Sequence, residues 1–181
     1  MRAFLGVPLP ALDSLKSLLR ALAECGADLK LVSADQFHLT IKFLGDVRPE
    51  WADALVKLIG KEPLPPAFDI AVKDVGVFPQ WRKFNVLWAG IEDPTGGLSK
   101  LNAAAERAWV GLGEVGEDRP FSPHLTLARK RGDKASDAAR AVLTEHRGLA
   151  FGTAHVDRLN LYQSTLTPAG SIYEVVHEVR L

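Results

Sequence analysis

Two short motifs in this chain carry residue types suited to acid–base chemistry. His38-Leu39-Thr40 recurs as His124-Leu125-Thr126, 86 positions later and close to half the chain length. Both copies lie in strand-like runs, and side chains alternate between the two faces of a strand. Alternation places the histidine and threonine of each copy on one face and the leucine on the other, toward a core. Each copy therefore offers an imidazole and a hydroxyl to a shared site.

Two imidazoles facing one site suit in-line displacement at phosphorus. The entering and leaving oxygens occupy opposite apices, so one needs a base and the other an acid. Imidazole has a pKa of about 6.5 and serves in either role, while a nearby hydroxyl donates to a non-bridging oxygen as charge shifts. The duplicated motif therefore predicts phosphoester chemistry without a metal, with His38 and His124 as the acid–base pair and Thr40 and Thr126 as phosphate donors.

The elements that must position these motifs are short strands alternating with amphipathic helices. Helices are predicted after Pro10, after Pro49, over residues 95–112 and over residues 136–146. Strands are predicted near residues 2–7, 28–32, 37–44, 68–77, 84–91, 122–128, 149–163 and 172–181. Hairpins outnumber helix crossovers, so the predicted class is α+β with mainly antiparallel sheets and flanking helices.

The motif repeat also predicts how the chain is organised. Two similar segments, each with one motif, indicate two pseudo-symmetric lobes around a central cleft, so residues 1–181 are predicted to form a single bilobal domain. The proline-rich stretch at residues 61–66 is predicted to be a stiff connector and the boundary between the lobes. The strands near residues 28–32 and 37–44 are expected to pair with each other.

Composition narrows the classes of function. Lysine plus arginine and aspartate plus glutamate both total 22, so the formal net charge is zero. Proteins that coat long nucleic acids usually carry a basic excess.

Cys25 is the sole cysteine, which excludes an intramolecular disulfide and suits the cytoplasm. No apolar run approaches the roughly 20 residues of a membrane span, and no secretory signal is evident. We expect a cytoplasmic monomer with no membrane association, metal or cofactor.

The residues around the motifs resemble a known family along nearly the whole chain. The segments FHLTIKFLGDV, SPHLTLAR and LYQSTLTPAGSIYEV, together with RAFLGVPLP and NVLWAGI, are similar to RNA 2′,3′-cyclic phosphodiesterases. These are also called 2′-5′ RNA ligases and belong to the 2H phosphoesterase superfamily. The resemblance implies a bilobal α+β fold and metal-free hydrolysis of a terminal RNA 2′,3′-cyclic phosphate to a 2′-phosphate. It also implies weak, reversible 2′-5′ joining of RNA ends, with tRNA fragments among the candidate substrates.

The resemblance also assigns the site residues by position. The catalytic set it implies is His38, Thr40, His124 and Thr126, with Arg129 as the cation beside the phosphate. Strict alternation from His124 puts Ala128 on the cleft side, so a bulge or strand end must turn Arg129 inward. Motif symmetry does not choose between acid and base. Because the family releases the 3′-oxygen, we assign His38 as the acid that protonates it and His124 as the base that activates water.

Five further basic residues are candidate RNA contacts: Lys42, Arg82, Lys83, Lys130 and Arg131. Lys42 lies on the His38 side of its strand by alternation. Lys130 and Arg131 directly follow the second motif. The other two lie within residues 78–84, where neighbouring aromatic rings suit base stacking and where relatives carry a loop rich in arginine and proline. Lys42 also fits a solvated strand residue, and Lys130 and Arg131 also fit a solvated turn.

Two other functions stay open at this point. A hydrolase of the same superfamily acting on a small, nucleotide-derived cyclic phosphate would suit the neutral net charge. An RNA-end-binding module would use the same cleft without turnover. The intact motif pair argues against the binding module, because such a module could lose either histidine freely.

Overall fold

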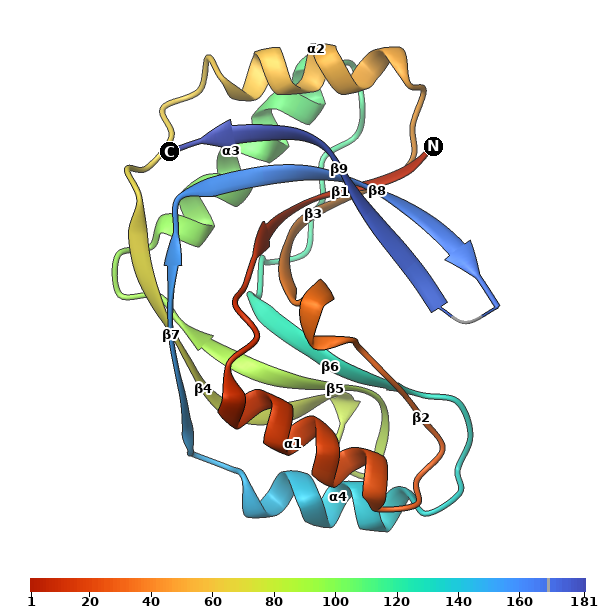
Figure 1. Cartoon of the computed structure of the whole chain (residues 1–181). Coiled ribbons are helices and arrows are strands. Elements are labelled where there is room, and N and C mark those ends of the chain that lie inside the picture. Colours follow the sequence, from red (N-terminus) through yellow and green to blue (C-terminus); the bar gives the residue numbers. More distant parts are fainter. Residues whose placement is uncertain (169) are drawn as a thin grey trace.

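The computed structural model describes residues 1–168 and 170–181 (Figure 1). The first half contains β1 (Arg2–Pro8), α1 (Asp13–Glu24), β2 (Leu29–Leu31), the 3₁₀ turn η1 (Ala34–Gln36), β3 (His38–Asp46) and α2 (Glu50–Ile59). The second half contains β4 (Phe68–Gln80), β5 (Lys83–Glu92), α3 (Gly97–Gly111), β6 (His124–Lys130), α4 (Ser136–Glu145), β7 (Ala150–Val156), β8 (Arg158–Thr167) and β9 (Gly170–Arg180). Strand pairing in these residues is antiparallel throughout, which confirms the predicted α+β class.

Two sheets form the body of the molecule, and each carries one motif. The four-stranded sheet has the order β3-β1-β8-β9, and the five-stranded sheet has the order β2-β6-β5-β4-β7. The first motif begins β3 and the second begins β6. In Figure 1, α2 and α3 lie with the first sheet at the top, whereas α1 and α4 lie with the second sheet at the bottom. Each motif strand therefore belongs to a different layer of the fold.

The chain crosses between the two sheets more often than the sequence indicated. β2 pairs with β6 while β3 pairs with β1, so the predicted pairing of residues 28–32 with residues 37–44 is wrong. The η1 turn redirects the chain between these two strands. Similarly, residues 149–163 are divided into β7 and β8, which belong to different sheets. The connector at residues 61–66 is therefore one of several crossings.

The helices bury the faces that their periodicity predicts. In α1 the residues Leu15, Leu18 and Leu22 are almost completely buried, as their three- and four-residue spacing requires. In α3 the buried stripe includes Leu98 and Leu101. The helices thus support the two sheets through these buried faces.

None of the helices in the described part of the chain is long and apolar enough to cross a membrane.

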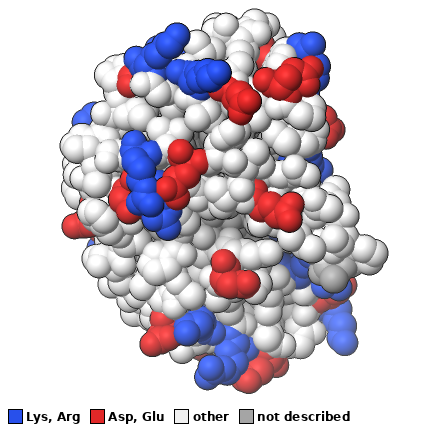
Figure 2. Space-filling model, turned by 45° about the horizontal axis from the view of Figure 1, so that its top comes forward, with Lys and Arg blue, Asp and Glu red and all other residues white. Residues whose placement is uncertain are grey.

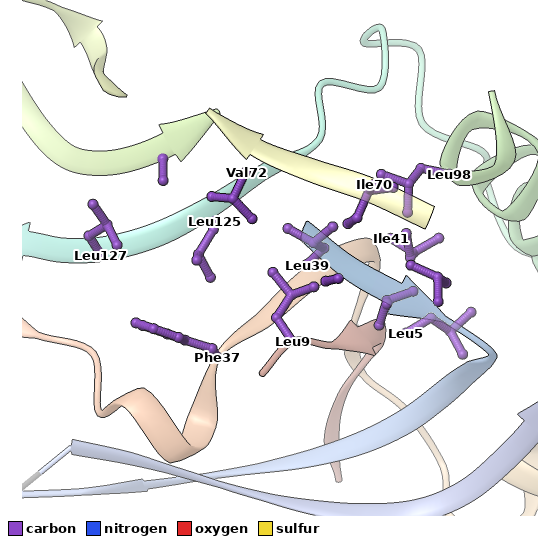
Figure 3. Close-up of a cluster of buried hydrophobic side chains, with 14 of the residues drawn as sticks. Leu5, Leu9, Phe37, Leu39, Ile41, Ile70, Val72, Leu98, Leu125 and Leu127 are labelled. Atoms are coloured by element: carbon purple, nitrogen blue, oxygen red, sulfur yellow. The ribbon is translucent and has the colours of Figure 1, made fainter. Parts of the chain in front are cut away.

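The hydrophobic core orients both motifs. Leu39 and Ile41 of β3 and Leu125 and Leu127 of β6 are buried, and Figure 3 shows them pointing into one apolar cluster. Burial of a leucine or isoleucine side chain stabilises the folded state by roughly 1.5–3 kcal/mol relative to leaving it exposed. Because these residues hold the inner face of each strand in the core, the alternating histidine and threonine side chains turn away from it.

Candidate active site

A β-bulge follows the first motif and changes which side chains face the cleft. Successive residues of β1 pair with Thr40 and Lys42, so Ile41 is an extra residue on β3. A bulge reverses the alternation beyond it. Lys42 is therefore buried, and its Nζ lies 2.7 Å from Oε1 of Glu106. The prediction that Lys42 lies on the His38 side is wrong, and Phe43 takes that side instead.

The second motif has the same irregularity at the matching position. Successive residues of β5 pair with Thr126 and Ala128, so Leu127 is the extra residue on β6. This is the bulge that strict alternation required, and it brings Arg129 to the cleft. Because both bulges fall three residues after the histidine, Phe43 and Arg129 occupy matching places in the two copies.

Both histidines are held in the same tautomer by their own backbone. Nδ1 of His38 lies 2.8 Å from the carbonyl oxygen of Gln36, and Nδ1 of His124 lies 2.8 Å from that of Ser122. A carbonyl oxygen only accepts hydrogen bonds, so each Nδ1 carries the hydrogen that it donates. Each Nε2 is consequently left as the nitrogen that can accept or release a proton.

The structure brings the motif residues together in one cleft of about 510 Å³. Its lining includes the predicted set His38, Thr40, His124, Thr126 and Arg129. Among the lining residues that our sequence reasoning did not single out are Arg2, Phe4, Ser171 and Tyr173. Alternation along β1 could have indicated the first two, because residues 2 and 4 share a face. The last two come from β9, whose return to the cleft is a tertiary feature.

This geometry coincides with extensive similarity to a known family. A family model described as the 2′-5′ RNA ligase superfamily matches residues 10–167. The chain belongs to this superfamily. An RNA 2′,3′-cyclic phosphodiesterase from Methanothermobacter thermautotrophicus is 31% identical over 100% of this chain and 99% of its own length. The resemblance inferred from the sequence is thereby confirmed.

Solved structures agree with the superfamily assignment. The crystal structure of TT0787 from Thermus thermophilus is 28% identical with a TM-score of 0.81, covering 100% of this chain and 98% of that one. LigT of Escherichia coli, crystallised with 3′-AMP, is 27% identical with a TM-score of 0.74, covering 99% of this chain and 97% of that one. The implied bilobal α+β fold is therefore confirmed.

The surroundings of the two motif histidines differ. The ring centroid of His38 lies 4.8 Å from that of Phe4 and 5.0 Å from that of Tyr173. Burial lowers the pKa of His38 below its ordinary value of 6.5, and the hydrogen bond to the Gln36 carbonyl opposes that shift. The ring centroid of His124 lies 4.9 Å from that of Phe78, in a T-shaped arrangement. His124 stands in a more open setting than His38.

The remaining candidate RNA contacts lie outside this cleft. Lys130 points to the opposite face of β6 from Arg129, where its Nζ lies 2.6 Å from Asp133 and 5.1 Å from the ring centroid of Phe84. Three other candidates are exposed at strand ends beyond the cleft: Arg82, Lys83 and Arg131. On the face drawn in Figure 2, basic and acidic side chains are intermixed. Within residues 1–168 and 170–181, no group of three or more His, Cys, Asp or Glu is arranged to hold a metal ion.

Proposed function

We propose that this protein is an RNA 2′,3′-cyclic phosphodiesterase that opens the terminal cyclic phosphate of an RNA to a 2′-phosphate. The observation that carries the proposal is the pair of histidines on one cleft, each with a free Nε2 and each accompanied by a threonine. The cyclic phosphodiesterase name of the relative from Methanothermobacter thermautotrophicus adds support.

The reaction needs one proton acceptor and one proton donor. Water attacks phosphorus, forms a new P–O bond and loses a proton to a neutral imidazole. The P–O3′ bond breaks at the opposite apex. The 3′-oxygen takes a proton from the other histidine, which starts the reaction as an imidazolium and ends it neutral. Water is thus added across the P–O3′ bond, and the two histidines end with their protonation states exchanged. With an RNA 5′-hydroxyl in place of water, the same steps give a 2′-5′ linkage, which is the basis for weak ligation.

We assign His38 as the acid and His124 as the base. Burial lowers the pKa of His38, so its imidazolium form releases a proton readily once it forms. The bound phosphate anion favours that charged form, because an opposite charge nearby stabilises it. His124 stands in the more open setting, where water reaches it. Because the acid must be protonated while the base is neutral, the activity should follow a bell-shaped pH profile.

Four other cleft residues have roles in this scheme. Thr40 and Thr126 donate hydrogen bonds to the non-bridging phosphate oxygens, and Arg129 balances the charge that accumulates there. Phe43 is 66% exposed although it is a large apolar ring, and it lines the cleft. An exposed ring beside a nucleotide site offers a surface on which a base stacks. These residues bind and orient the cyclic phosphate between the two imidazoles.

The test compares a short RNA ending in 2′,3′-cyclic phosphate with a mononucleoside 2′,3′-cyclic phosphate. The proposal expects faster turnover of the RNA, a 2′-phosphate product and full activity in excess EDTA, since the imidazoles supply both acid and base. Preference for the mononucleotide would favour a small-nucleotide hydrolase, the class suggested by zero net charge. Tight binding of the RNA without turnover would indicate an end-binding module. Activity that EDTA removes and added metal restores would contradict the two-histidine mechanism.

A further inference from the structure

A second groove opens from the cleft on the side of β2 and the β8–β9 hairpin. It has a volume of about 320 Å³ and is continuous with the cleft, because both are lined by Arg129, Ser171 and Tyr173. Its wall on the β2 side includes Lys30 and Gln36. We call this space the β2 groove.

Two positive charges lie side by side in the β2 groove. Lys30 of β2 pairs directly with Arg129 of β6 in the antiparallel ladder, so the two side chains project from the same face. Like charges at directly opposed positions destabilise a sheet. In the described chain, neither side chain has a carboxylate within 4.0 Å, and no acidic residue lines the groove. An anion bound between them would remove this repulsion.

The Lys30 side chain reaches across the β2 groove. A Cβ placed on Gly170, the first residue of β9, would lie 3.4 Å from the Nζ of Lys30. Gly170 has a φ of +149°, a backbone conformation that other residues rarely adopt. The ammonium group thus lies between the second sheet and the end of the hairpin that belongs to the first sheet. A chain that leaves the cleft through this groove would pass beside it.

The opposite extension of the cleft has a different charge pattern. That space, of about 300 Å³, is lined by Glu106 and Glu117 as well as by Lys42 and Arg119. Its cations are already paired, since Lys42 contacts Glu106 and Arg119 contacts Glu117. An RNA backbone gains little there, because the carboxylates offset the attraction of the cations. The uncompensated cations favour the β2 groove as its path.

We propose that the β2 groove binds the phosphodiester immediately 5′ of the nucleotide that carries the cyclic phosphate, with Lys30 as its specific contact. The inference rests on the proposed function and deepens it, because it makes an RNA strand, rather than a free nucleotide, the preferred substrate. Arg129 lies between the two phosphates and faces both spaces.

The experiment measures the turnover of three substrates by the chain of residues 1–181. They are a mononucleoside 2′,3′-cyclic phosphate, a dinucleotide with the same end, and that dinucleotide with an uncharged methylphosphonate linkage. Lys30→Met keeps the aliphatic stem and removes only the charge. A charged hydrogen bond is worth roughly 1.5–3 kcal/mol, or about 10-fold or more. The variant should lower kcat/KM about 10-fold on the natural dinucleotide and less than about 2-fold on the other two.

Lys57→Met is the matched control, because Lys57 is exposed on α2 and lies outside the groove. It should leave all three substrates unchanged, and a thermal melt checks that both variants are folded. An equal loss on all three substrates, or no loss on any, would overturn the β2 groove while leaving the cyclic phosphodiesterase standing. Absence of wild-type turnover on every substrate would overturn the proposed function, and this inference with it.

Discussion

The two motif strands, β3 and β6, share one backbone path but offer different surroundings. Each presents a histidine bonded through Nδ1 to the carbonyl two residues earlier, then a threonine, then a bulge. Beyond the bulge, β3 presents Phe43 and β6 presents Arg129. A site with strict two-fold symmetry would bind the cyclic phosphate in either orientation. The shared features supply the chemistry, and the features that differ must orient the substrate.

Among changes in these two strands, removing either imidazole should have the largest effect on the activity. We expect His38→Ala and His124→Ala each to lower kcat by about 10²–10⁴-fold, the usual contribution of an acid–base group. The double variant should lose less than the product of the two, because groups that act as a unit are non-additive. The measurement is steady-state hydrolysis of the cyclic-phosphate RNA.

A third histidine provides the control for these variants. His155 lies outside the cleft and contacts Asp69, so His155→Ala should keep near wild-type activity. A wild-type kcat in either motif variant would contradict the two-histidine scheme.

A sulfur leaving group should separate the two histidines. Replacing the bridging 3′-oxygen with sulfur gives a thiolate, which leaves without protonation. If His38 is the acid, the thio substrate should restore most of the activity lost in His38→Ala, a recovery of at least about 10-fold. His124→Ala should show no such recovery, since water still needs a base. Recovery confined to the His124 variant would exchange the two assignments.

Changing Arg129 tests whether the asymmetric position orients the substrate. Arg129→Met removes the charge and keeps a similar stem, and should lower kcat/KM by roughly 10- to 100-fold, as expected for a lost charged hydrogen bond. If Arg129 also sets orientation, the remaining product should contain some 3′-phosphate beside the 2′-phosphate. Chromatography against both isomers measures the ratio. Lys130→Met, on the opposite face of β6, is the control, and an unchanged rate in Arg129→Met would remove this residue from the site.

The smallest expected effect concerns the protonation of His38. Its pKa should lie below 6.5, because burial disfavours the imidazolium. Tyr173→Ala removes one ring from its surroundings and should move the pKa of His38 back toward 6.5, as followed by the NMR shift of its imidazole proton. A pKa at or above 6.5 in the free wild type would contradict this account.

The same shift has a consequence for stability. As the pH falls through 6.5, the unfolded chain takes up a proton at this histidine before the folded chain does. Stability rises with pH wherever the unfolded state binds more protons. His38 therefore favours the folded state least at low pH, and its contribution is lost as the pH falls below 6.5. His38→Gln should weaken this pH dependence in denaturant titrations, and an unchanged dependence would oppose the idea.

Several features of the site follow from local sequence. Side chains on a strand alternate, so the placement of His38 with Thr40 and of His124 with Thr126 could be predicted from spacing alone. Apolar periodicity and turn residues were enough for the α+β class and for the ranges of most helices and strands. Even the need for a bulge before Arg129 was evident, because alternation otherwise turned it away from the cleft.

Only the tertiary structure decided which strands pair, where the first bulge falls and what surrounds each histidine. A bulge is defined by the neighbouring strand, so the chain around Lys42 gives no local sign that its side chain is buried against Glu106. The opposition of Lys30 and Arg129 likewise depends on a crossing between sheets. The lowered pKa of His38 depends on burial by rings from β1 and β9. Register and desolvation both arise from contacts between distant segments, which local patterns do not encode.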